Sequence, residues 1–365
     1  MNSNTHQKHT GAAVVAAEAS PPIVRHPRTL SKASLAAVMA TVALLTAGCG
    51  GGGGDTPPAP SPSAPTVEPP AVASVPDPVY DDPRRTSAFE RLNQVRAQAG
   101  LGKLTQNKLI DVAAQAHSQY LILNNAIGHE EISGAPGYYE GIPSSRLGKA
   151  GFSDFVLVSE VAAPLIYANG VPEKSGADLI DTLIATPYHR NGMLRPQISE
   201  AGFGVYHNGI RAALTADMTY NEKNIQGAPK TPYIIWPVDG AVDIATTMPP
   251  EIPNPIPENG NEPAGYPVSL QTNIDFRGVD ATVFEIHDTS LGNDPIKNLV
   301  PTKLLTYKNN TSNGDHAFTA ALPRSPLKKN TRYTVKFRGN IISDGKEDTP
   351  LEKEWSFTTG NKDYF

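Results

Sequence analysis

The sequence of 365 residues contains one cysteine, Cys49, and has no excess of basic side chains. A single cysteine cannot form a disulfide within the chain, so each folded part must be held together by its own core. Lys and Arg number 31 against 36 Asp and Glu; the first 48 residues hold four basic and one acidic side chain, which leaves 27 and 35 for the rest. Because phosphate backbones require a basic footprint, this balance argues against nucleic acid as a partner.

Two hydrolase motifs are also missing. The sequence has no Gly-x-Ser-x-Gly, and its only thiol lies beside a run of glycines, which argues against a covalent hydrolase. The segment "HEEIS" at 129–133 is not His-Glu-x-x-His, the zinc-binding motif of metalloproteases. Any hydrolysis would therefore need a different set of side chains.

An apolar stretch near the amino terminus, "SLAAVMATVALLTAGC" at 34–49, is too short to span a bilayer, which takes about 20 residues. Arg25, Arg28 and Lys32 precede it, so residues 1–48 are typical of a signal peptide with a long basic region. The ending "LLTAGC" resembles the lipobox of bacterial lipoproteins, which implies lipidation of Cys49. Thr46 stands where that motif usually has leucine, which leaves ordinary signal-peptidase cleavage open.

Residues 49–83 form a tether in this interpretation. Five glycines follow Cys49, and then comes the proline-rich "DTPPAPSPSAPTVEPPAVASVPDPV". Glycine provides a flexible joint and proline an extended spacer. We therefore expect export to a bacterial cell envelope, either with a lipid anchor in the outer membrane or as a secreted protein.

Residues 84–222 have the periodicity of an α+β domain. We expect helices over 86–101, with Ser87 and Glu90 as a capping box and Gly100 at the end, over 107–125, and over 176–190. A strand is expected within 155–163, and a hairpin over 201–220 with Asn208–Gly209 in a type I′ turn. The side chains expected to face the core are Leu109, Val112, Ala113, Ala116, Tyr120 and Leu123 in the second helix, and Leu179, Leu183 and Ile184 in the third.

Five stretches in this region resemble the CAP superfamily (cysteine-rich secretory, antigen 5 and pathogenesis-related 1 proteins) in its disulfide-free bacterial form. They are "LNQVRAQAGL", "LIDVAAQAHSQYLILNNAIGH", "SRLGKAGF" with "SEVAA", "TPYHRNGML" and "SEAGFGVY", in family order over roughly 85–220. The resemblance implies an α-β-α sandwich, with helices around a small antiparallel sheet.

The resemblance also implies a cleft with two histidines and two acidic residues. His129 matches the first histidine, Glu160 the first acid and His189 the second histidine; Glu200 is the candidate for the second acid. The family's "GEN" is "SEV" here, which keeps the acid and loses the asparagine. His117 is expected to be structural, and Arg190 to pair with a carboxylate or cap a helix.

Two imidazoles and a carboxylate suit zinc or another divalent metal. A carboxylate beside an imidazole can equally tune the imidazole's pKa for acid–base work. A cleft that only binds fits the same residues. No cofactor is therefore assigned, and the balance of these arguments leans away from an enzyme.

Residues 231–361 read as a second, all-β domain after a linker at 223–230. Short alternating segments such as "ATVFEIHD", "TRYTVKFRG" and "EWSFTTG" have sandwich spacing and resemble bacterial Ig-like modules. The proline-rich stretch at 248–267 is expected to be a long loop of this domain. We interpret the domain as a spacer or stabilising module, with adhesion as the alternative.

CAP-superfamily proteins are linked to lipid or sterol binding and to interactions at surfaces. The resemblance therefore implies an anchored protein whose cleft binds a small apolar ligand or a surface protein. The alternatives are metal-assisted hydrolysis or proteolysis by His129, Glu160 and His189, and a structural envelope protein with a vestigial cleft.

Overall fold

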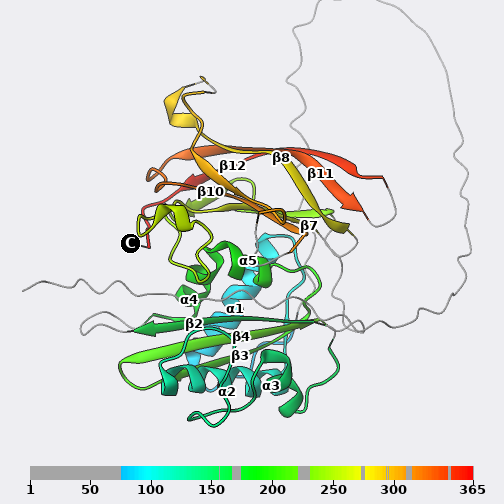
Figure 1. Ribbon diagram of the computed structural model, residues 1–365, viewed down its shortest axis with the longest axis vertical. Coiled ribbons are helices and arrows are strands. Elements are labelled where there is room, and N and C mark those ends of the chain that lie inside the picture. The colour runs from blue at the N-terminus through cyan, green and yellow to red at the C-terminus, as the bar shows by residue number, and fades with distance from the viewer. Residues whose placement is uncertain are drawn as a thin grey trace, which may run out of the picture. The chain divides into compact units, whose positions relative to one another are not determined.

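The computed structural model describes residues 75–155, 157–166, 174–220, 231–272, 276–292, 294, 296–309, 315–343 and 347–364, all within one compact unit (Figure 1). The predicted signal peptide, Cys49, most of the tether and the linker at 223–230 lie outside the described residues. Among the helices that are described, none combines the length and apolarity needed to cross a membrane.

The first region is built on a four-stranded sheet in the order β1-β3-β4-β2. Its strands are β1 (Thr105–Gln106), β2 (Leu157–Ile166), β3 (Glu200–His207) and β4 (Arg211–Tyr220). The pairs β2–β4 and β3–β4 are antiparallel, and β1 runs parallel to β3. Figure 1 shows α1, α4 and α5 over one face of this sheet and α2 and α3 over the other. The predicted α+β region is therefore confirmed.

Helix α1 (Pro83–Gln98) begins earlier than expected. Asp82 is its N-cap, accepting a hydrogen bond from the backbone N–H of Arg84 at 2.9 Å, and a proline fills the first helical position. The predicted capping box at Ser87 is wrong, because an aspartate followed by proline starts the helix one turn upstream. Gly100 follows the helix end with φ +74°, as expected for a C-terminal glycine.

Helix α2 (Lys108–Asn124) packs closely on β3. A Cβ on Gly204 would lie 2.3 Å from the backbone of Ala114, so glycine permits this approach. The predicted buried stripe is partly wrong. Ala113 and Tyr120 are buried, but Leu109, Val112 and Leu123 are 42%, 47% and 45% exposed. The face on the sheet includes the polar His117 and Ser118 instead.

The expected helix over 176–190 is two helices, α4 (Gly176–Ile184) and α5 (Pro187–Met193). Proline disfavours a helical conformation in the residue before it, so the chain breaks at Thr186, which is extended with ψ 145°. Leu179, Leu183 and Ile184 are buried as predicted. A short helix that the sequence had not indicated, α3 (Pro143–Lys149), follows the loop after α2.

The predicted hairpin is confirmed, but its turn is not type I′. Gly209 has φ +90°, while Asn208 is not among the residues with positive φ that a type I′ turn requires. The side chain of Asn208 instead accepts hydrogen bonds from the N–H groups of Ile210 and Arg211. This Asx-type contact holds the turn.

The second region is all-β and contains two four-stranded sheets, ordered β5-β7-β10-β9 and β6-β12-β11-β8. Its strands are β5 (Tyr233–Trp236), β6 (Ala241–Ile244), β7 (Val268–Thr272), β8 (Phe276–Asp288), β9 (Thr302–Leu305), β10 (Phe318–Pro323), β11 (Arg332–Ser343) and β12 (Thr349–Thr359). The proline-rich stretch lies between β6 and β7. The all-β prediction is confirmed at this level, whereas the Ig-like assignment stays a prediction.

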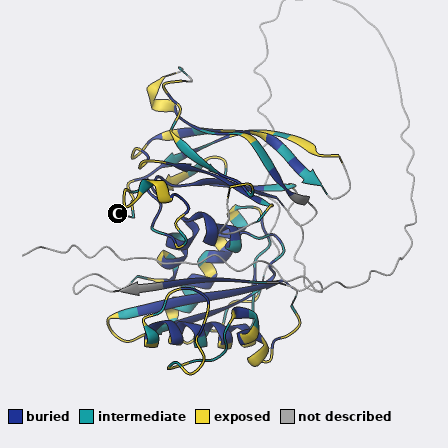
Figure 2. Ribbon diagram, in the orientation of Figure 1, coloured by how far each residue is buried: buried dark blue, intermediate teal, exposed yellow. Residues whose placement is uncertain are grey.

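Both regions contribute to a single hydrophobic cluster. In the second region, Phe284 of β8 contacts Phe337 of β11 with ring centroids 5.3 Å apart, and Trp355 of β12 lies beside them. Residues from α1, α4, α5 and the first sheet belong to the same cluster. Figure 2 shows how the buried positions concentrate along the strands and the inner faces of the helices.

Candidate functional site

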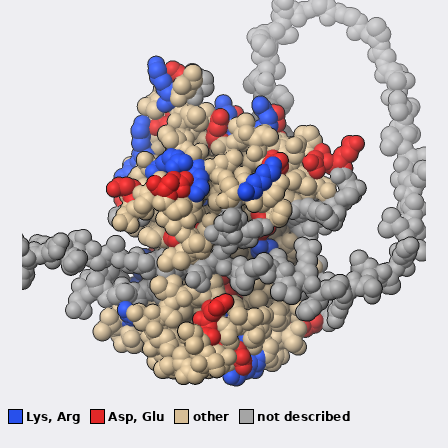
Figure 3. Space-filling model, in the orientation of Figure 1, with Lys and Arg blue, Asp and Glu red and all other residues tan. Residues whose placement is uncertain are grey.

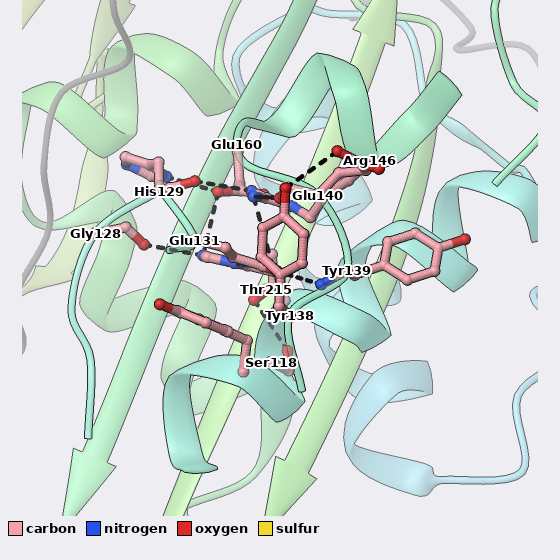
Figure 4. Close-up of polar contacts among 12 residues, drawn as sticks. Ser118, Gly128, His129, Glu131, Tyr138, Tyr139, Glu140, Arg146, Glu160 and Thr215 are labelled. Carbon is pink, nitrogen blue, oxygen red and sulfur yellow. Dashed lines mark hydrogen bonds and ion pairs between the residues drawn. The ribbon is translucent and has the colours of Figure 1, made fainter. Parts of the chain in front are cut away.

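A buried cluster of charged side chains lies between α2, α3 and β2 (Figure 4). It contains His117 of α2, His129 and Glu131 of the following loop, Arg146 of α3 and Glu160 of β2. All five are at most 6% exposed. Burying this many ionisable groups is costly unless each is paired, so the contacts among them decide what the cluster can do.

Glu160 is the centre of the cluster. Its Oε1 lies 2.8 Å from Nδ1 of His129, and its Oε2 accepts a hydrogen bond of 2.7 Å from Nη2 of Arg146. Burial alone would raise the pKa of Glu160, but the charges of Arg146 and the two histidines outweigh it and hold that pKa well below its usual range. Glu160 is therefore an ionised carboxylate.

Arg146 connects the loop after α2 to strand β2 through hydrogen bonds. Besides Glu160, it donates hydrogen bonds to the carbonyl oxygens of His129 at 3.0 Å and Glu140 at 3.2 Å. Its Nη1 also lies 3.7 Å from Glu131. Burial opposes its charge, but the neighbouring carboxylates prevail and raise the pKa of Arg146. It is thus a permanent cation inside the protein.

His117 and Glu131 form a second pair beside the first. Nδ1 of His117 lies 3.0 Å from Oε1 of Glu131, and its Nε2 donates to the carbonyl oxygen of Gly128 at 2.9 Å. The other oxygen of Glu131 accepts the backbone N–H of Tyr139 at 2.7 Å. The expectation that His117 is a core residue agrees with its complete burial, but its partner is a carboxylate.

Asp217 of β4 stands directly opposite Glu160 of β2 in the antiparallel pair. Cross-strand partners of this kind point to the same face of the sheet. Burial, followed by the negative charge of Glu160, raises the pKa of Asp217 well above its usual range. The two carboxyl groups are therefore shifted in opposite directions, and the folded protein favours the protonated form of Asp217 beside an ionised Glu160.

The structure brings together only two of the four residues expected in the cleft. Side chains of successive strand residues point to opposite faces. A Cβ on Gly192 of α5 would clash with the hydroxyl of Ser159, so Ser159 faces α5 and Glu160 faces α2. His189 belongs to α5 and hence to the other face of the sheet from Glu160.

His189 and Glu200 have partners of their own. Nδ1 of His189 lies 3.0 Å from Glu251, a residue between β6 and β7, and 2.7 Å from the hydroxyl of Thr186. Glu200 begins β3, and its Oε1 accepts a hydrogen bond from Asn107 at 3.1 Å. Within the residues that the structure describes, no group of three or more His, Cys, Asp or Glu side chains is arranged to hold a metal ion. The roles predicted for His189 and Glu200 stay predictions.

A family comparison identifies the first region of the chain. The model of the cysteine-rich secretory protein family, CAP, matches residues 89–217. Residues 89–217 form a CAP domain. The match includes every residue of the buried cluster and ends at Asp217, so the second region lies outside it.

Solved structures similar to the chain include three with related titles. An outer surface protein of Borrelia burgdorferi is 13% identical, with 40% of this chain and 97% of that chain covered and a TM-score of 0.33. An extracellular protein of Bacillus anthracis with an SCP domain is 21% identical, covering 38% and 40%, with a TM-score of 0.30. Venom allergen-like protein 4 of Schistosoma mansoni is 13% identical, covering 41% and 97%, with a TM-score of 0.26. No curated protein matches.

The CAP domain contacts the second region through consecutive residues of α5. The ring of Tyr188 packs in an apolar cluster with Met248 and Phe318, and its backbone N–H donates to Glu251. Arg190 is fully buried; it caps α4 through the carbonyl of Ile184, at 2.8 Å. Its Nη1 donates across the contact to the carbonyl oxygen of Pro267 at 2.6 Å.

Arg190 therefore caps a helix, as one alternative predicted. In place of a carboxylate it has the ring of Tyr266, 5.0 Å away. Burial lowers the pKa of Arg190. Two neighbouring side chains, Asn191 and Arg195, both donate hydrogen bonds to the carboxylate of Asp315 in the second region, at 2.9 and 2.6 Å. The contact thus combines apolar clusters with buried polar groups of α5.

Sequence reasoning missed two members of the cluster, Glu131 and Arg146, and also Asp217, which stands opposite Glu160. Asp217 was detectable in principle, because "ALTADMTY" alternates and places this acid among small residues on the face of Glu160. Arg146 gave no such signal, since an arginine in "SSRLGK" normally points to solvent. Only the position of α3 against β2 shows that it is buried.

Proposed function

We propose that this protein is an exported, envelope-anchored binding protein that works through an apolar outer face of its CAP domain and not by hydrolysis. One observation carries the proposal: α2 exposes a stripe formed by Leu109, Val112, Ala116, Gln119 and Leu123, here named the α2 outer face. Three of these are large aliphatic side chains more than 40% exposed. A contiguous apolar patch on a soluble domain is typical of an interaction site.

The buried cluster supports a structural role for the histidines and carboxylates. Glu160 contacts a histidine and an arginine at hydrogen-bond distance, and Arg146 reaches three acceptors. A hydrolase needs groups that substrate can reach, whereas Glu160 is 4% exposed. Metal-assisted hydrolysis would also need His189, which lies on the other face of the sheet.

Export and anchoring rest on the sequence alone. The apolar stretch ending in "LLTAGC" supports a lipid anchor at Cys49, and the Gly- and Pro-rich residues after it support a tether. In this proposal the anchor holds the CAP domain at the envelope surface, where the α2 outer face meets its partner. The partner is an apolar surface.

The test uses the chain from residue 49 onward with Cys49→Ser, so that no acyl chain contributes. The protein is sedimented with washed bacterial envelope fragments, beside a Val112→Gln/Leu123→Gln variant. A matched control, Val242→Gln/Ile296→Gln, removes two side chains that are 71% and 85% exposed in the second region.

We expect the wild type and the control to sediment with the fragments and the α2 variant to stay in solution. Equal sedimentation of all three proteins would contradict the proposal. A peptidase or esterase activity that disappears in a Glu160→Gln variant would favour the hydrolase instead.

A further inference from the structure

The exposed apolar side chains of this protein are unevenly distributed. Of the thirteen large hydrophobic residues found exposed among the described residues, six fall between positions 109 and 142. They are Leu109, Val112, Leu123, Ile127, Ile132 and Ile142. All belong to α2, the loop after it or the N-cap of α3, in the layer that covers one face of the CAP sheet. Single exposed apolar residues are ordinary, but six in one layer need an explanation.

The α2 outer face is continuous and uncharged. Its positions 109, 112, 116, 119 and 123 are spaced by three or four residues, so they form one stripe about 21 Å long. None of the five carries a charge. A helix face in contact with water normally carries charged side chains, and this one does not. Figure 3 shows Lys and Arg interspersed with Asp and Glu mainly over the second region, in the upper half of the view.

The chain enters the folded unit beside the start of α2. The backbone N–H of Val79 donates to the side chain of Gln106 at 2.7 Å, and the Gln106 amide donates back to the Val79 carbonyl at 3.2 Å. The hydroxyl of Tyr80 donates to Asp111, in the first turn of α2, at 2.9 Å. The segment before α1 is therefore fixed beside the start of α2.

This entry point limits where an anchor can act. The described chain begins at Val75, 26 residues after Cys49. Covalent geometry lets that many residues span at most about 90 Å. A lipid on Cys49 would thus keep the start of α2 within that distance of the membrane, and at a high effective concentration beside it.

We propose that the α2 outer face, together with Ile127 and Ile132, lies on the surface of a lipid bilayer. The inference rests on the proposed function and names the partner as lipid. Aliphatic side chains would enter the boundary between headgroups and acyl chains, while the helix stays parallel to the surface. Anchoring by a single weak element is reversible, so a lipid on Cys49 and this face would act as two cooperating contacts.

The composition of the face favours lipid over a protein partner. Protein interfaces draw most of their binding energy from tryptophan, tyrosine and arginine, often in pockets. The α2 outer face has none of these three residue types; it has leucine, valine, alanine and glutamine. A stripe that is aliphatic apart from Gln119 offers area but few directional contacts, which suits a fluid apolar surface.

The experiment measures partition into protein-free vesicles of phosphatidylcholine, with and without phosphatidylglycerol, by flotation. The proteins are the chain from residue 49 with Cys49→Ser, the Val112→Gln/Leu123→Gln variant and the Val242→Gln/Ile296→Gln control. We expect the α2 variant to lose about tenfold or more of the partition coefficient, because two half-exposed aliphatic side chains no longer enter the lipid. The control should match the wild type, and added salt should change little. Equal unfolding midpoints show that the variants are folded.

Several outcomes would overturn the inference. If the wild type binds envelope fragments but floats with neither vesicle type, the proposed function stands and the partner is a protein. If the α2 variant floats as well as the wild type, the face is not the lipid contact. A dimer in sedimentation that the α2 variant abolishes would identify a second copy as the occupant. Absence of binding to both fragments and vesicles removes the proposed function as well.

Discussion

Replacing Arg146 with methionine tests whether the buried cluster stabilises the CAP domain. Arg146 is fully buried, and its guanidinium makes three hydrogen bonds, the shortest at 2.7 Å to Glu160. Methionine fills similar space but leaves the carboxylate of Glu160 without its cation. We expect this single change to destabilise the folded protein strongly.

The magnitude follows from burial. Removing one partner of a buried ion pair costs about 3–5 kcal/mol, because an uncompensated charge remains in the interior. The carbonyl oxygens of His129 and Glu140 lose donors as well, which places the expected loss near the middle of that range, about 4 kcal/mol. At about 2–4 °C per kcal/mol, the unfolding midpoint should fall by roughly 8 °C or more.

Arg338 provides a matched control. Its Nε lies 2.8 Å from Glu352, almost the same distance as in the buried pair, but the two side chains are 65% and 73% exposed. An exposed pair contributes about 0–1 kcal/mol, so Arg338→Met should shift the midpoint little. Urea denaturation of both variants, followed by far-ultraviolet circular dichroism, gives the two free energies.

The reasoning would be refuted if the two variants lost the same free energy, or if Arg146→Met lost less than about 1 kcal/mol. Either result would mean that solvent reaches the cluster, in which case burial is not what makes this pair strong. A double variant, Arg146→Met/Glu160→Gln, completes the test. It should recover part of the loss, because it leaves no unpaired charge.

Three further changes are expected to have distinct effects, each measured by urea denaturation. The raised pKa of Asp217 means that the folded chain holds this proton more tightly than the unfolded chain. The free energy of unfolding should therefore fall as pH rises above about 4 toward the raised pKa. Asp217→Asn should flatten that dependence, and an unchanged pH profile would contradict the assignment. Glu251→Ala removes the acceptor of two backbone N–H groups and the partner of the His189 side chain. It should lower the free energy of unfolding by about 3 kcal/mol, and a loss below about 1 kcal/mol would show that this contact is dispensable. Gly204→Ala should lower the free energy of unfolding by about 2 kcal/mol, because the new Cβ meets the backbone of α2. Gly148→Ala in α3 has open space around its Cβ and should be neutral or slightly stabilising. Equal effects of the two changes would refute the packing argument.

Local signals were sufficient for most of the fold. Helix α2, strand β2 and the β3–β4 hairpin were predicted because period and end signals depend only on neighbouring residues. The buried face of α2 was predicted incorrectly at Leu109, Val112 and Leu123. Hydrophobicity alone set the expected face, but the sheet beneath α2 offers glycines and Thr215, whose hydroxyl accepts a hydrogen bond from Ser118 at 2.9 Å.

The site was predictable only in part, for a similar reason. His129 and Glu160 were identified from the family resemblance, and in the structure Nδ1 of His129 lies 2.8 Å from Oε1 of Glu160. Arg146 and Asp217 become members only when α3 and β4 are folded against β2. The partner of His189 lies 62 residues further along the chain, in the second region, so no pattern around "TPYHR" could indicate it.

The buried contact between α5 and the second region has a consequence for how this protein can change. Tyr188, Arg190 and Asn191 each have a specific partner in the second region: the apolar cluster with Met248, the carbonyl oxygen of Pro267 and the carboxylate of Asp315. Exchanging the second region for another β module would bury Arg190 without its acceptor, and truncating the chain at Asp217 would expose the ring of Tyr188 to water. The two regions should therefore be inherited and transplanted as one module, although the CAP family match covers only the first.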